Sequence, residues 1–148
     1  LYGLIIALVS LSAYMIVPIY HLMQQHIAIT YVNILQFLKH PLILKKAQTY
    51  AFCTLALSQL FHSIGMKNME NSAFDKRLFQ NKLLILSFLL GYLIQILVTE
   101  VPFLSQAFKT THLAFSDWII ITFFSMIPLV VHELLAWIKK IKRKQKLS

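Results

Sequence analysis

Four long runs of apolar residues dominate the sequence. They cover about residues 4–20, 47–66, 83–99 and 118–138, and the only charged side chain inside them is Glu133. A helix needs about 20 residues to cross a bilayer, and backbone groups in hydrocarbon must pair within their own segment. A membrane β-barrel would alternate apolar and polar residues, which these runs do not. The sequence therefore predicts an all-α fold, an integral membrane bundle of four transmembrane helices.

Composition excludes the main alternatives to a membrane protein. Hydrophobic residues make up 58% of the chain and charged residues 13%, whereas a soluble domain carries roughly 25% charged residues. Disordered chains are polar and poor in aromatic residues, and a disulfide scaffold needs more than the single Cys53. We therefore expect residues 1–148 to form one membrane domain.

The placement of Lys and Arg predicts the orientation. The loop between the second and third runs and the tail 139–148 carry ten of these residues, and the opposite side carries four. Because cytoplasmic segments are enriched in Lys and Arg, both termini are predicted to be cytoplasmic, in a multi-pass protein that we expect in the plasma membrane. The basic tail favours anionic lipid as its partner. No nucleic acid is expected, because no aromatic residues interleave the charges.

Three local expectations concern the ends and connections of these helices. The chain begins at Leu1, immediately before the first apolar run, which predicts a piece of a longer protein. The segment 21–46 is longer than a tight turn and predicts a short helix in the membrane interface, ended by Pro41. Pro128 lacks the N–H that would bond to Phe124, which predicts a kink in the fourth helix.

Each predicted helix carries a stripe of small and polar residues. In lipid such residues mark the faces on which helices pack, so we expect a closely packed bundle. The stripes comprise Gly3, Ala7 and Ser10; Thr54, Ser58 and His62 with Ala47, Ala51 and Gly65; Ser87, Gly91, Gln95 and Thr99; and Thr122, Ser125, His132 and Ala136.

Gln59 is the candidate for an ion-site residue. It lies near the middle of the second run, about 140° around the helix from Thr54. A buried amide needs a partner, so we expect Gln59 to face protein or a water-filled path, either in a hydrogen bond between helices or as an oxygen ligand of calcium. His62 and His132 are interpreted as lone imidazoles, without the ligand spacing of a zinc or haem site.

The sequence offers no catalytic residues and no cofactor-binding motif. With three glycines in all, it has no nucleotide-binding loop, and its five acidic residues are scattered over loops and helix ends. We expect no catalytic activity and no cofactor in this chain.

The order of several motifs resembles calcium-transporting P-type ATPases of the bacterial and plasma-membrane type. The similarity is carried by Ala51-Phe52-Cys53-Thr54-Leu55, Ser58-Gln59-Leu60-Phe61-His62, Leu78-Phe79-x-Asn81-Lys82, Val101-Pro102-Phe103-Leu104, Phe108-x-Thr110, Asp117-Trp118, and Ser125, Pro128 and Glu133. The motifs span about residues 51–140, and residues 1–20 resemble the family more weakly. The resemblance identifies the chain with the last four membrane helices of such a pump.

The resemblance implies a role that the composition alone does not supply. It implies a membrane scaffold that supports the ion path of an ATP-driven pump, with calcium as the transported ion and Mg-ATP used elsewhere in the full-length protein. The partners would be the other membrane helices and the cytoplasmic domains, and Gln59 would lie where related pumps place a calcium-site group. The alternative is a stand-alone four-helix membrane protein, either a regulatory subunit or a degenerate relic.

Overall fold

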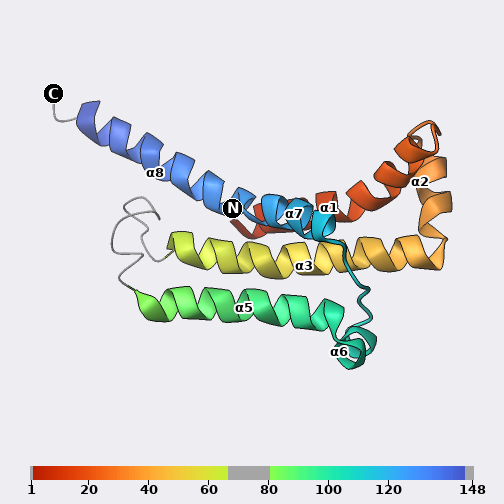
Figure 1. Cartoon of the computed structure of the whole chain (residues 1–148). Coiled ribbons are helices and arrows are strands. Elements are labelled where there is room, and N and C mark those ends of the chain that lie inside the picture. The colour runs from red at the N-terminus through yellow and green to blue at the C-terminus, as the bar shows by residue number, and fades with distance from the viewer. Residues whose placement is uncertain (1, 67–80, 146–148) are drawn as a thin grey trace.

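The computed structural model describes residues 2–66 and 81–145, with side chains up to Ile141. The helices in this part of the chain are α1 (Tyr2–Gln24), α2 (Tyr31–Leu38), α3 (Pro41–Met66), α5 (Lys82–Glu100), α6 (Pro102–Ala107), α7 (Phe115–Ser125) and α8 (Ile127–Gln145) (Figure 1). No strand occurs among the described residues, so the all-α prediction is confirmed for them. The predicted cytoplasmic loop with Lys67, Lys76 and Arg77, and the motif residues Leu78 and Phe79, lie outside the described residues.

Helix α3 is the centre of the bundle. It contacts α1, α5, α7 and α8, and Figure 1 shows α5 beside it on one side and α1 and α7 on the other. The main core lies where α1, α3 and α7 meet, around the fully buried Cys53, Leu57 and Ile121. Every other long helix therefore packs on α3.

The prediction of four transmembrane helices is confirmed only in part. Three helical segments are long and apolar enough to cross a membrane: α1, α5 and the combined α7–α8 segment Phe115–Ile141. Helix α3 is long enough, but side chains such as Gln48, Gln59 and His62 make it more polar than the other three. These side chains lie on two sides of the helix: His62 lies on a side packed against other helices, whereas Gln48 and Gln59 are exposed in this chain.

Pro41 both separates two helices and begins the second of them. Helix α2 ends at Leu38, as the sequence predicts, but α3 starts at Pro41 rather than near residue 47. Proline suits the first turn of a helix because its missing N–H would be unpaired there anyway. The carbonyl of His40 accepts the N–H of Leu44 and so begins the helical hydrogen bonds. The second predicted helix therefore begins before the uncharged run 47–66 and includes Lys45 and Lys46.

The fourth predicted transmembrane helix is divided, as Pro128 predicts. Helix α7 ends at Ser125 and α8 begins at Ile127, with Met126 between them. Figure 1 shows α8 diverging from the bundle beyond this point. Because Pro128 has no N–H, the backbone ladder is interrupted here and the two helices take different directions.

Candidate functional site

Gln59, the predicted ion-site residue, lies on the open side of α3. It is exposed in this chain, and the exposed residues of α3 between positions 48 and 66 form one narrow stripe along the helix: Gln48, Leu55, Gln59, Ser63 and Met66. We call these five residues the open stripe. Thr54, by contrast, is fully buried, which agrees with the large angle between the two side chains around the helix. The amide of Gln59 thus points away from the helices that surround α3.

The described residues do not assemble a metal centre. Among residues 2–66 and 81–145, no group of three or more His, Cys, Asp or Glu side chains is placed to hold a metal ion. A hard cation such as calcium takes six or more oxygen ligands, and one exposed amide supplies one of them. Gln59 alone among the described residues therefore does not make an ion site.

The small-residue stripes predict the packed face correctly for α3 and for α7–α8. Thr54, Ser58, Ser125 and His132 are all buried, and the Ser125 hydroxyl donates to the Thr54 carbonyl at 3.3 Å. The prediction is wrong at Gly3 and Ala7 of α1 and at Ser87 of α5, which are exposed. On α1 the prediction holds at Ser10, which is buried and donates to the Ala51 carbonyl at 2.8 Å, and Ile6, Val9, Ala13 and Val17 complete the packed face.

A polar network that the sequence analysis missed joins α3 to the first turn of α7. Asp117 is 7% exposed, accepts a 2.5 Å hydrogen bond from the Tyr50 hydroxyl and forms a 2.9 Å salt bridge with Lys46. Its second oxygen also accepts the backbone N–H of Ala114 at 2.9 Å. The sequence did contain a clue to this network. Lys46 and Tyr50 lie one helical turn apart, and Asp117 stands at the start of an apolar run.

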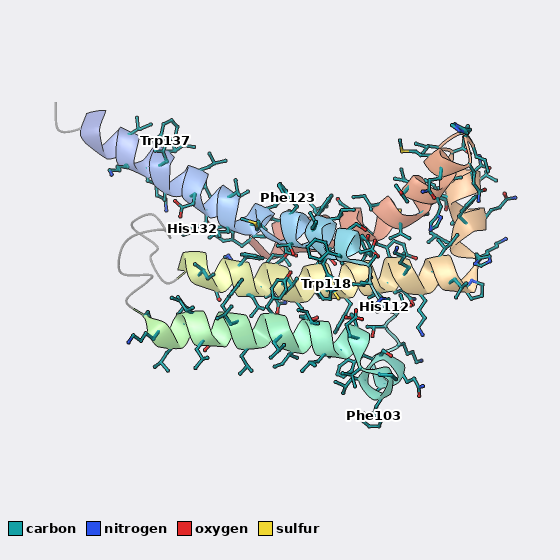
Figure 2. The ribbon with its side chains drawn as sticks, in the orientation of Figure 1. Phe103, His112, Trp118, Phe123, His132 and Trp137 are labelled. Atoms are coloured by element: carbon teal, nitrogen blue, oxygen red, sulfur yellow. The ribbon has the colours of Figure 1, made fainter. Side chains whose placement is uncertain are left out.

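The connection between α6 and α7 is held by further polar contacts. The Thr110 hydroxyl donates to the Val98 carbonyl at 2.7 Å, and the backbone N–H of Thr111 donates to the Thr49 hydroxyl at 3.0 Å. Exposed His112, labelled in Figure 2, pairs with Glu100 at the end of α5. These contacts fasten the connection to both α3 and α5, so this end of the bundle is fixed by hydrogen bonds as well as by packing.

The two histidines that the sequence presents as unrelated meet at the other end of α3. The ring of Tyr2 lies 4.5 Å from the ring of His62 and 6.1 Å from that of His132. The Tyr2 hydroxyl is 3.2 Å from His132 Nδ1. Figure 2 shows His132 on the side of α8 turned toward α3, where it packs against Gly65. The two imidazoles thus share Tyr2 as a neighbour, which the sequence does not reveal, and no group of three metal-ligating side chains includes them among the described residues.

Comparison with known proteins places this helical arrangement in a family. The family described as the C-terminus of cation-transporting ATPases matches residues 1–138. A calcium-transporting ATPase 1 from Bacillus cereus is 39% identical over 94 residues, which is 64% of this chain and 11% of that protein. A calcium-transporting ATPase from Bacillus subtilis is 36% identical over 95 residues, again 64% of this chain and 11% of the relative.

The similarity extends to eukaryotes. A calcium-transporting ATPase from Plasmodium falciparum is 25% identical over 100 residues, covering 68% of this chain and 8% of the relative. The chain thus spans about a tenth of the length of the relatives it matches.

Proposed function

The chain belongs to the family of cation-transporting ATPase C-termini, and we propose that it is the C-terminal membrane scaffold of an ATP-driven calcium pump. In this role it supports helices that form the ion path, and ATP is hydrolysed by domains encoded elsewhere in the pump. The calcium-transporting relatives in two Bacillus species support the choice of ion.

The open stripe on α3 carries this proposal. A polar side chain in the middle of a membrane-spanning helix is costly when it faces hydrocarbon, so Gln59 requires a protein neighbour or water, whereas the Ser63 hydroxyl already donates to the Leu60 carbonyl at 2.7 Å. The described helices leave this side of α3 uncovered. Further membrane helices of the pump, packed on the open stripe, would cover both residues, which is what a scaffold provides.

The proposal includes α3 as a fourth transmembrane helix. Its 26 residues exceed the length needed to cross a bilayer, and it runs beside α5 through the same layer (Figure 1). With four crossings both termini lie on one side, and the distribution of Lys and Arg favours the cytoplasm as that side. The basic tail then meets the anionic inner surface of the plasma membrane.

We propose Gln59 as one oxygen donor to the transported calcium or to a group that holds it. Its exposed position allows an amide oxygen to reach an ion bound between α3 and a helix packed on the open stripe. Gln48 provides a matched control, because it has the same side chain on the same stripe, roughly 16 Å away along the helix.

The test is substitution in the full-length pump that carries these residues. Gln59→Ala should raise the calcium concentration needed for half-maximal phosphorylation by ATP, while Gln48→Ala should leave it unchanged. Equal calcium dependence of Gln59→Ala and the parent protein would exclude a role at the ion site and leave only packing.

A second experiment separates the scaffold from the stand-alone alternative. Residues 1–148 are expressed alone and also together with the remainder of the pump as a separate polypeptide. A scaffold should aggregate alone in detergent and should restore calcium-dependent ATP hydrolysis when both parts are present. A monodisperse chain that neither associates with the remainder nor restores activity would favour the stand-alone protein.

A further inference from the structure

A row of polar side chains at every fourth position winds gradually around α3, by about 40° at each step. The row consists of Lys46, Tyr50, Thr54, Ser58 and His62. Over these residues α3 rises roughly 24 Å, at about 1.5 Å per residue, which is most of the thickness of a bilayer core. The first part of the row faces α7: Tyr50 donates to Asp117, and the Ser125 hydroxyl donates to the carbonyl of Thr54. The end of the row lies near α8, where His132 packs on Gly65.

The two ends of this row differ in how well their polar atoms are paired. At the α7 end, Asp117 pairs with both Tyr50 and Lys46. At the α8 end, four buried atoms have no hydrogen-bond partner among the described residues: Thr54 Oγ1, Ser58 Oγ, His62 Nδ1 and His132 Nε2. The one other buried side-chain atom in this condition within the described part of the chain is Gln95 Oε1. The unpaired atoms are thus concentrated in one interface.

These atoms are also deeply placed. Thr54 and Ser58 are 0% exposed and His132 is 5% exposed, although all three carry groups that bond strongly to water. A buried donor or acceptor without a partner costs about 1–3 kcal/mol. Four such atoms together would destabilise a bundle whose other polar contacts are well made. A common partner would remove this cost.

The chemistry of His132 identifies a water molecule as that partner. When the Tyr2 hydroxyl donates to His132 Nδ1, the free Nε2 of the ring carries the proton and needs an acceptor. When Nδ1 donates to Tyr2 instead, Nε2 needs a donor. Water serves both tautomers because it donates and accepts, and the Ser58 and Thr54 hydroxyls can bond to it in either sense. The His132 ring fills the space in front of Gly65, so the water must lie beside Ser58 and the two rings rather than at Gly65.

We propose that water molecules bind inside the bundle in a pocket formed by Tyr2, Thr54, Ser58, His62 and His132, here called the histidine pocket. Because Thr54 and His62 lie about 12 Å apart along α3, more than one water is needed: some bond to the free ring nitrogens of the two histidines and others to the two hydroxyls. The binding of this water depends on neither calcium nor Gln59.

Hydroxyl-radical footprinting of the full-length protein in membranes tests the proposal. A short X-ray pulse produces radicals from water, including bound internal water, and side chains next to that water are oxidised. We expect oxidation of His62 and His132 within a few-fold of the rate at exposed His112, which has the same side chain. Cys53 is the dry control, because its reactive thiol is 0% exposed in an apolar cluster. Oxidation of His132 as slow as that of Cys53 would overturn the proposal.

Removing the two hydroxyls changes the melting temperature in opposite directions for a hydrated and for a dry pocket. If Thr54 and Ser58 bind water, Thr54→Val and Ser58→Ala should lower the melting temperature and slow His132 oxidation several-fold. If the pocket is dry, both changes remove an unpaired group and should raise the melting temperature. Ser12→Ala is the control, because the Ser12 hydroxyl is exposed and donates to the Leu8 carbonyl within its own helix. Should a variant fail to fold, footprinting of the parent protein still decides.

Discussion

Asp117→Asn is the substitution that most directly tests how α7 is held on α3. The change keeps the size of the side chain and removes its charge. The carboxylate accepts from the Tyr50 hydroxyl at 2.5 Å and from the Ala114 N–H at 2.9 Å, and it pairs with Lys46 at 2.9 Å. An amide has one acceptor oxygen in place of two, so the side chain of the variant cannot satisfy all three donors.

The expected loss of stability follows from these contacts. A hydrogen bond to a charged group contributes about 1.5–3 kcal/mol. Removing one member of a buried ion pair costs about 3–5 kcal/mol, because the other charge is left unpaired. The side chain of Lys46 is 34% exposed, so water compensates for part of its lost partner. We therefore expect Asp117→Asn to lower the free energy of unfolding by about 2–3 kcal/mol.

Alkylation of Cys53 provides the assay. This residue is the single cysteine of the chain and is 0% exposed, so it becomes reactive only when the core around α3 opens. Heating the protein with a thiol reagent, followed by mass spectrometry of the Cys53 peptide, gives the midpoint of opening for each variant. Lys46→Met should recover part of the loss in the Asp117→Asn background, whereas Lys45→Met, at an exposed neighbour, should not. An unchanged midpoint for Asp117→Asn would refute the reasoning.

Substitutions at Gly65 and Asn81, each with a control, test packing and capping with the same assay. Gly65→Ala should lower the free energy of unfolding by about 1–3 kcal/mol, because its Cβ would lie 3.0 Å from the buried ring of His132. Gly91→Ala should change it less, because its Cβ meets only the flexible end of Leu60 and alanine favours helix. Asn81→Ala should cost about 1 kcal/mol by removing the bond from the Leu84 N–H to the Asn81 side chain at the start of α5, and Asn81→Asp should retain it.

Hydrophobicity predicts the helices well but not which of them is central. The uncharged runs place α1, α5 and the α7–α8 segment close to their observed positions. Helix α3 looks weaker by the same measure because Gln48, Gln59 and His62 interrupt it. Its central place depends on contacts between distant parts of the chain, which the hydropathy of one segment does not report. A single sequence therefore indicates a helix here but not its place in the bundle.

The candidate site shows the same limit at the level of single residues. Spacing along α3 correctly separates the buried Thr54 from the exposed Gln59. It does not reveal that His62 and His132 meet, because they are far apart in the sequence and α8 changes direction near Pro128. Nor does it pair Asp117 with its partners on α3, since those contacts depend on the register between α3 and α7. Local periodicity thus predicts which face of a helix is buried. Which residues of two helices contact each other is known only from the folded chain.

The break at Pro128 means that this segment does not move as one rod. Helix α7 is held on α3 by the hydrogen bond between Asp117 and Tyr50, and on α5 by a 2.7 Å hydrogen bond between Thr122 and Tyr92. Helix α8 leaves the bundle and carries Trp137 outward, where it is 63% exposed (Figure 2). Because Leu129 and His132 still pack against α3, a pull on the far end of α8 would act first on the part of the helix beyond His132, and α7 would keep its contacts.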